Sequence, residues 1–263
     1  MDLGLKDKRA FVAGASRGLG FATALGLAKE GCKLVINSRD ESNIKFAAEK
    51  IASETGAQVS GLAGDVGEKS VVEKLVIEAA KILGGLDLLL TNAGGPPPGS
   101  FESHSDETWQ KAIDLSFMSH VRFINSALPY LRKSDAASVL TVTSISVKQP
   151  VENLILSNSV RSATVGLTKS LALELGKDGI RFNSILPGWT ETERIVELMA
   201  ARAEANNSTL QEEADKQSAQ APLGRMGTPE EFANAAVFLL SPAASYITGV
   251  MLNVDGGMYK GTL

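Results

Sequence analysis

The sequence predicts a single α/β domain, in which a doubly wound parallel sheet of seven strands carries helices on both faces. Short apolar, β-rich runs alternate with longer stretches of helical period. The short runs are apolar almost throughout, as in strands buried on both faces of a helix-covered parallel sheet. A chain of 263 residues with a 44% apolar share is long enough to bury a substantial core. No internal repeat, linker or boundary interrupts the pattern, so residues 1–263 are expected to form one domain.

The expected elements follow this alternation along the whole chain. Strands are expected at residues 9–14, 33–38, 58–64, 86–92, 138–144, 180–186 and 251–255. Helices are expected at residues 18–30, 42–54, 68–83, 105–132, 155–176 and 228–240. Because crossovers between parallel strands are right-handed, this order gives a doubly wound sheet.

Two segments depart from the alternation. GGPPPG, residues 94–99, predicts a rigid loop after the fourth strand, and residues 190–220 form a polar, helix-prone excursion after the sixth. Ligands of doubly wound sheets bind beyond the carboxyl ends of the strands. Segment 190–220 is therefore expected to be a substrate lid, with a solvated helical pair at an oligomer edge as the alternative.

Composition argues against several function classes. The net charge is −4 and no basic block is present, which argues against nucleic acid or an acidic membrane surface as a partner. The chain has one cysteine and two histidines, His104 and His120, so neither a disulfide nor a metal site is expected. The start MDLGLKDKRA lacks the pattern of a signal peptide, and no apolar run is long enough for a membrane span. A cytoplasmic enzyme or binding protein is expected.

A glycine-rich turn joins the first strand to the first helix. FVAGASRGLGFATALGLAKEG places Gly14, Gly18 and Gly20 with the spacing G-x-x-x-G-x-G. Glycine permits positive φ and a close approach of the backbone to a ligand. The helix that starts near Gly18 directs its free N–H groups and positive dipole end at the same place, which favours a pyrophosphate. The strand–turn–helix context makes this a dinucleotide site rather than an ordinary turn.

Further motifs match one family over nearly the whole chain. They are GASRGLG (14–20), DV (65–66), LDLLLTNAG (86–94), Ser144, GLTKSLALEL (166–175), IRFNSILPGWTET (180–192) and SYITGVMLNVDGG (245–257). With them the chain resembles the short-chain dehydrogenases/reductases, and most of all the 3-oxoacyl-[acyl-carrier-protein] reductase branch. The resemblance implies a Rossmann-type fold, a nicotinamide dinucleotide and a small carbonyl or alcohol substrate. It also implies a homotetramer or homodimer, formed through the two long helices at 105–132 and 155–176.

The residues after the second strand favour NADP over NAD. NAD is held by an acidic residue at the end of that strand, whereas NADP needs cations for its 2′-phosphate. Here Ser38 stands in the acidic position, Arg39 follows it, and Arg17 lies in the glycine-rich turn. Two guanidinium groups beside a hydroxyl suit a phosphate dianion. The resemblance assigns the rest of the cofactor site to Gly14, Ser16, Gly18, Leu19, Gly20, Asp65, Val66, Asn92, Ala93, Gly94, Arg161, Pro187, Gly188 and Thr192.

The catalytic positions of the family are mostly altered. Relatives carry Ser, Tyr, Lys and Asn, in which Ser polarises the carbonyl, Tyr supplies the proton and Lys lowers the pKa of Tyr. In this chain Ser144 is kept, whereas Ser157, Arg161 and Ser116 stand at the Tyr, Lys and Asn positions. The tyrosines, at 130, 246 and 259, lie outside this helix, so no shift of the alignment restores the phenol.

These changes alter the proton supply more than the electrostatics. A phenol has a pKa of about 10 that a nearby cation lowers, whereas an aliphatic hydroxyl is far too weak an acid to be tuned this way. Arg161 still supplies charge and can grip ribose hydroxyls or a substrate carboxylate. Water relayed through Ser157 or Ser144 would then be the proton source. His120, one helical turn after Ser116, is an alternative acid, although such a histidine is more often a packed residue.

Three functions remain open from the sequence. The first is an NADP-dependent reductase or dehydrogenase with an altered proton path. The second is a nucleotide-binding protein without turnover, such as a sensor or an inactive subunit. The third is non-redox chemistry on the same scaffold, as in the halohydrin dehalogenases, which use Ser, Tyr and Arg.

Overall fold

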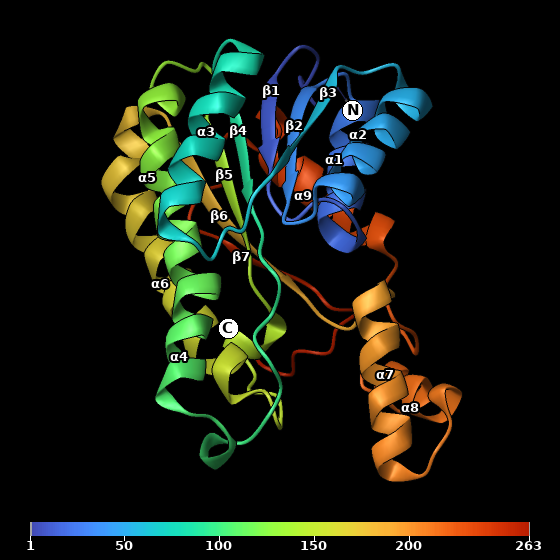
Figure 1. Cartoon of the computed structure of the whole chain (residues 1–263). Coiled ribbons are helices and arrows are strands. Elements are labelled where there is room, and N and C mark those ends of the chain that lie inside the picture. Colours follow the sequence, from blue (N-terminus) through green and yellow to red (C-terminus); the bar gives the residue numbers. More distant parts are fainter. Residues whose placement is uncertain (1, 263) are drawn as a thin grey trace.

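A single parallel sheet forms the centre of the computed structural model, which describes residues 2–262 (Figure 1). Its strands are β1 (Arg9–Val12), β2 (Lys33–Ser38), β3 (Val59–Ala63), β4 (Leu88–Thr91), β5 (Ser138–Val142), β6 (Arg181–Pro187) and β7 (Met251–Val254). They lie in the order β3-β2-β1-β4-β5-β6-β7. Every neighbouring pair is parallel. The predicted fold class is therefore confirmed. The strand at 33–38 has the expected bounds, β6 is shifted by one residue, and the other five strands are one to three residues shorter than expected.

Helices cover both faces of this sheet. One face carries α1 (Gly18–Lys29), α2 (Glu41–Thr55) and α9 (Pro229–Leu240), which share one buried core with the sheet. The other face carries α3 (Lys69–Leu83), α5 (Ser119–Leu131) and α6 (Ile155–Leu175), which share a second core. Phe11 on β1 and Phe182 on β6 are completely buried in this second core. Burial on both sides explains why the strands are apolar without alternation.

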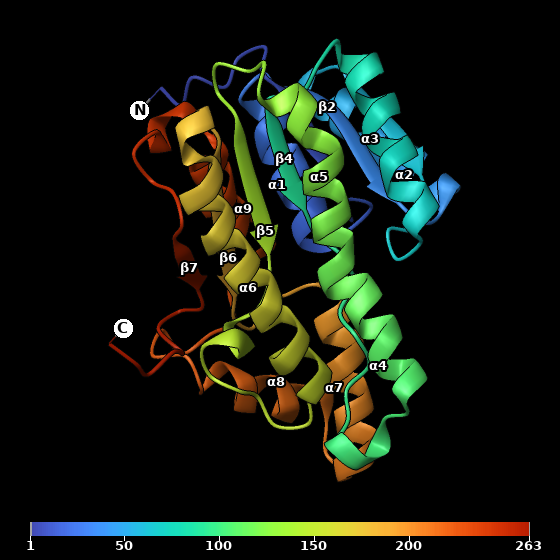
Figure 2. The same ribbon diagram turned by 90° about the vertical axis from the view of Figure 1, so that its left-hand side faces the viewer.

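Three helices lie beyond the end of the sheet. Both views show α4 (Asp106–Ile113), α7 (Glu193–Asn206) and α8 (Leu210–Ser218) at one end of the molecule (Figures 1 and 2). The strands that lead to them, β4 and β6, are parallel to the rest, so this end is the carboxyl edge of the sheet. The predicted excursion 190–220 is thus a helical pair, which turns at Asn207 (φ 49°) and restarts with a capping box from Thr209 to Glu212.

The expected helix at 105–132 is not continuous. A π-helical segment, Asp114–Met118, separates α4 from α5. The hydroxyl of Thr164 on α6 donates to the Ser116 carbonyl oxygen at 2.8 Å. A carbonyl of this widened turn thus has a hydrogen-bond partner on another helix. π-Helical turns of this kind often lie at functional sites. Periodicity along the sequence cannot show the interruption, because the extra residue depends on a partner from another helix.

No helix among the described residues combines the length and the apolar character that crossing a membrane requires.

Candidate active site

The end of β1 meets the end of β4 at the centre of the sheet. Strand order reverses between these two strands, and doubly wound sheets bind ligands at such a switch point. The Asn92 side-chain amide donates to the Gly14 carbonyl oxygen at 3.2 Å and so joins the two strand exits. The structure thereby brings the glycine-rich turn and the loop after β4 to one place.

The glycine-rich turn forms a cradle that side chains would fill. Gly14 has a φ of 63°, and a Cβ there would lie 2.7 Å from the Asn92 side-chain nitrogen. A Cβ on Gly20 would collide with the Gly14 carbonyl oxygen, so glycine lets α1 pack directly against the turn. Gly18 also has a positive φ, of 59°. These are the positions at which the sequence predicts a close approach of backbone to ligand.

The N-terminus of α1 suits an anion. Arg17 at the N-cap makes no capping hydrogen bond, and the described first turn of α1 contains no acidic residue. The free N–H groups and the helix dipole therefore favour a negative charge beside Gly18. The turn and this helix end fit the pyrophosphate of a dinucleotide.

The residues expected to read the 2′-phosphate lie at neighbouring strand ends. The Ser38 hydroxyl donates to the Asp40 carbonyl oxygen at 3.2 Å, and the Arg39 side chain is exposed. Arg17 instead donates to Glu197 of α7 at 3.2 Å. In the described structure no contact joins Arg17, Ser38 and Arg39. Asp65, which resemblance assigns to the adenine, follows β3 and accepts from the Gly67 N–H at 2.8 Å.

The retained serine lies at the end of β5. Ser144 precedes a short 3₁₀ turn, and its hydroxyl accepts from the Ser146 N–H at 3.1 Å. The Ser146 and Ser157 hydroxyl oxygens are 3.3 Å apart. Ser157, in the first turn of α6, is buried. Ser146 thus links Ser144 at the end of β5 to Ser157 in the first turn of α6.

Arg161 lies directly behind Ser144. Its Nη1 donates to the carbonyl oxygens of Val142 and Thr143, at 3.2 Å and 3.0 Å. Burial lowers the pKa of Arg161 to about 10, and the nearby charge of Arg194 contributes to the lowering. The guanidinium remains charged at neutral pH. A buried positive charge is therefore held against the strand end that carries the candidate catalytic serine.

Ser116 and His120 lie on the helical segment that packs against α6. Both are buried, and the Ser116 hydroxyl and His120 Nε2 have no hydrogen-bond partner among the described residues. His120 Nδ1 and the Thr91 hydroxyl are 2.7 Å apart. Burial, together with the charge of Arg161, lowers the pKa of His120 to about 3. His120 is therefore neutral at physiological pH, which argues against the alternative that it acts as the acid.

Comparison with known proteins decides the family. The family model described as "Enoyl-(Acyl carrier protein) reductase" matches residues 14–259. Dehydrogenase/reductase SDR family member 4 from Bos taurus is 35% identical over 256 residues, which cover 96% of this chain and 88% of the relative. The chain belongs to the short-chain dehydrogenase/reductase family. The predicted resemblance is confirmed at this level.

Solved structures of the family show the same architecture. L-Sorbose reductase from Gluconobacter frateurii, complexed with NADPH and L-sorbose, has a TM-score of 0.95 at 32% identity and covers 99% of this chain and 100% of its own. A short-chain oxidoreductase from Pseudomonas aeruginosa PAO1 has a TM-score of 0.89 at 29% identity, over 98% of this chain and 100% of its own. That structure is NADPH-bound and is described as containing an atypical catalytic center.

Arg194 is a residue near the site that the sequence pattern did not indicate. Arg194, two residues after Thr192, extends from the start of α7 to the loop after β4. Its guanidinium donates to the carbonyl oxygens of Gly95 and Pro96, at 3.3 Å and 3.4 Å. A Cβ at Gly18 would lie 3.5 Å from Thr192 Cγ2, so the start of α7 also covers the glycine-rich turn. The only sequence signal was an arginine close to an expected cofactor residue.

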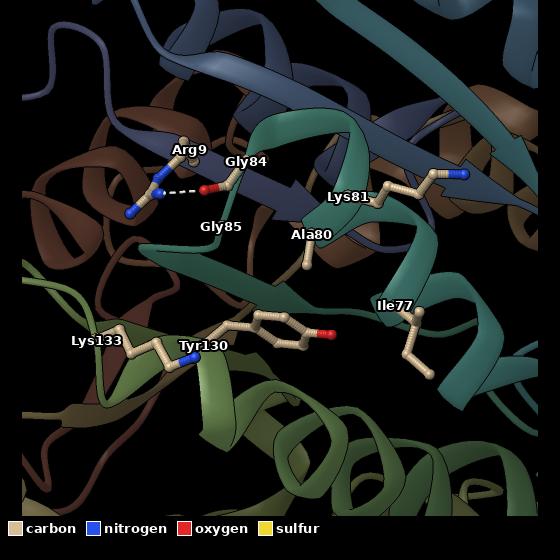
Figure 3. Close-up of a pocket in the computed structure, with 8 residues that line it drawn as sticks. All are labelled: Arg9, Ile77, Ala80, Lys81, Gly84, Gly85, Tyr130 and Lys133. Atoms are coloured by element: carbon tan, nitrogen blue, oxygen red, sulfur yellow. Dashed lines mark hydrogen bonds between the residues drawn. The ribbon is translucent and has the colours of Figure 1, made fainter.

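A hollow on the surface lies away from this site. It has a volume of about 370 Å³ and lies between the carboxyl ends of α3 and α5, beside the start of β1. The side chains of Arg9, Lys81, Tyr130 and Lys133 line it, and the Tyr130 ring extends toward Ile77 (Figure 3). Because Arg9 begins β1, this hollow is at the amino edge of the sheet. It is therefore not the dinucleotide site of a short-chain dehydrogenase/reductase.

Proposed function

We propose that this chain is an NADP(H)-dependent carbonyl reductase or alcohol dehydrogenase with an incomplete catalytic tetrad. Ser144 is the retained catalytic residue, and Ser116, Ser157 and Arg161 replace the family's Asn, Tyr and Lys. The position of Arg161 carries the proposal. Its guanidinium hydrogen-bonds the two carbonyls before Ser144, so positive charge lies behind the hydroxyl that would bind the carbonyl oxygen.

NADP(H) would supply the hydride. Gly14, Gly18 and Gly20 would hold its pyrophosphate, and Arg17, Ser38 and Arg39 would contact the 2′-phosphate. To contact the phosphate, Arg17 must give up its ion pair with Glu197. Both side chains of this pair are exposed, so the pair is weak. Two NADPH-bound relatives with TM-scores of 0.95 and 0.89 support this choice of cofactor.

The chain's own residues would then polarise the substrate carbonyl. The Ser144 hydroxyl donates to the carbonyl oxygen, and Arg161 stabilises the negative charge that develops there. The carbonyl carbon accepts the hydride, and its oxygen takes a proton from water, hydrogen-bonded to Ser157 or Ser144. The products are an alcohol and NADP⁺. Segment 190–220 would act as the lid over this reaction, because α7 contacts both the glycine-rich turn and the loop after β4.

A catalytically inactive NADP-binding protein is the second candidate. It is favoured by the missing acid: His120 has a pKa of about 3, and Arg161 of about 10. Neither group delivers protons efficiently at neutral pH.

Two measurements separate these candidates. Fluorescence titration of the purified protein with NADPH and NADH is expected to give much tighter binding of NADPH. Failure to bind either dinucleotide refutes both candidates. NADPH binding with no oxidation across quinone, aldehyde, β-ketoacyl and sugar-ketone substrates supports the inactive protein, and one robust substrate refutes it.

A further inference from the structure

A polar hollow lies between the lid and the loop after Ser144. It has a volume of about 530 Å³, within the range of small-molecule sites. Residues 149–153 form one wall, Trp189 forms a second, and α7 and α8 form the third. We call this hollow the lid pocket.

Two walls of the lid pocket are connected to the candidate site, one to a catalytic residue and one to the cofactor residues. Its first wall is tied to α6 by Asn158, the neighbour of Ser157, whose side-chain amide donates to the Val151 carbonyl at 2.9 Å and accepts from the Val151 N–H at 3.2 Å. Its second wall, Trp189, follows Pro187 and Gly188 at the end of β6. Both walls therefore belong to segments that follow β5 and β6, the strands whose ends carry the candidate active site.

Unpaired amide groups distinguish this pocket from an apolar substrate site. Gln217 on α8 is only 5% exposed. Its Oε1 accepts from Gln220 at 2.9 Å, but its Nε2 donors have no partner among the described residues. Gln149, which also lines the pocket, accepts from the Lys260 N–H at 3.2 Å, and its Nε2 is likewise unpaired in the described structure. Both glutamines line the pocket, and their Nε2 groups make no hydrogen bond to the described chain, so they are free to donate to a ligand. A ligand with several oxygen atoms suits such donors, and an acyl chain does not.

Trp189 adds a rigid apolar wall. Its Nε1 donates to the Gln220 side-chain oxygen at 3.2 Å, and the Arg202 guanidinium lies 5.3 Å from the centre of its ring. A fixed aromatic ring among amides suits a molecule with hydroxyl groups on a carbon skeleton.

The charges of the lid pocket favour a neutral ligand. Glu213 is buried, and its Oε1 accepts from Lys216 at 2.6 Å, Ser208 at 2.7 Å and Asn206 at 3.2 Å. This carboxylate is therefore already neutralised. Glu152 and Arg202, which carry opposite charges, also line the pocket. No excess of cations remains that would call for a carboxylate or phosphate on the substrate.

We propose that the lid pocket binds a neutral polyhydroxylated ketone or aldehyde, and that this class, rather than an acyl thioester, is the substrate. The proposal rests on the reductase function given above. Gln149 and Gln217 donate to substrate oxygens, and Trp189 packs against the carbon skeleton.

Matched substrates and one variant pair test this assignment. D-Fructose and L-sorbose are compared with 2-hexanone, which has the same chain length, and with an acetoacetyl thioester. Since a site built to bind hydroxyl groups strongly rejects analogues that lack them, kcat/KM is expected to be at least about 10²-fold higher for a ketohexose. Gln217→Met is expected to raise the ketohexose KM by about 3- to 10-fold, from one lost hydrogen bond. Gln211→Met on the same helix, outside the pocket, should leave KM unchanged.

Binding without turnover separates this proposal from the reductase proposal. Calorimetric titration of the protein–NADP⁺ complex with sorbitol, xylitol and the ketohexoses measures occupancy of the pocket directly. Binding that Gln217→Met weakens and Gln211→Met does not supports the pocket assignment even if no carbonyl is reduced, in which case only the reductase proposal fails. Binding of none of these compounds, or faster reduction of 2-hexanone or the thioester, overturns it.

Discussion

A tyrosine at position 157 is expected to raise the rate of carbonyl reduction by about 10²–10⁴, the usual contribution of a positioned general acid. None of the side chains described at the native site replaces this acid. Ser144 and Ser157 carry aliphatic hydroxyls, and His120, with a pKa of about 3, is buried. At pH 7 a group with that pKa is protonated in roughly one molecule in 10⁴. The proton must therefore come from water.

Arg161 is placed to tune the new phenol. It lies one helical turn after position 157, and its pKa of about 10 keeps it charged at pH 7 in all but roughly one molecule in 10³. A nearby cation stabilises the phenolate and so lowers the phenol pKa below about 10. Ser157→Tyr alone, without a lysine, is therefore expected to gain activity. Its reduction rate should fall at alkaline pH as the phenol loses its proton, a decline that is not expected of the native protein.

The assay is NADPH oxidation at saturating NADPH, followed from pH 5 to pH 10. Ser157→Phe is the matched control, because it adds the same ring without the hydroxyl. Thermal unfolding and NADPH affinity show whether each variant folds, since enlarging a buried side chain costs about 1–3 kcal/mol. A folded Ser157→Tyr protein that binds NADPH but reduces ketones no faster than Ser157→Phe would refute the reasoning.

Three further predictions concern the cofactor, the catalytic serine and the stability of the fold. Arg194→Met is expected to weaken NADPH and NADH binding by the same factor, about 10-fold, because its guanidinium holds the start of α7 to the loop after β4, beside the expected dinucleotide site. Arg39→Ala should weaken only NADPH binding, and titration of both variants with both dinucleotides checks this. Ser144→Ala should lower kcat/KM by about 10²–10³ while NADPH affinity is unchanged, and an unaltered kcat/KM would contradict the site. Asp87, 4% exposed in its side chain, accepts from Arg9 Nε at 2.9 Å and Nη2 at 2.7 Å, so Asp87→Ala should cost about 2–3 kcal/mol and lower Tm by about 5–10 °C. Burial raises the pKa of Asp87, but the hydrogen bonds from Arg9 and Ser134 and the charge of Arg9 together lower it below its ordinary value. This stabilisation is complete above the unfolded pKa of about 4 and is lost as pH falls through the lower folded value, so the Tm difference between the two proteins should vanish in acid.

Local patterns were enough to predict the sheet and the turn. Each strand is buried on both faces, so its apolar run is visible without any knowledge of its neighbours. The glycine-rich turn is equally local, because positive φ at Gly14 and Gly18 is a property of a few consecutive residues. The alternation of strands and helices then leaves one common topology, the doubly wound sheet, which the structure confirms.

The sequence alone predicted the fold class, the dinucleotide turn and the serine and arginine at the expected tyrosine and lysine positions, because each depends on residue type at short spacing. The tertiary structure alone placed Arg161 behind Ser144, made His120 neutral and brought Arg194 to the loop after β4. It also assembled the lid pocket from the loops after β5 and β6 and from α7 and α8. These features arise where segments far apart in the chain meet. Burial and the charge of a neighbouring residue set the pKa of a side chain, and packing decides whether an amide finds a partner. Neither can be inferred from the spacing of residues along one segment.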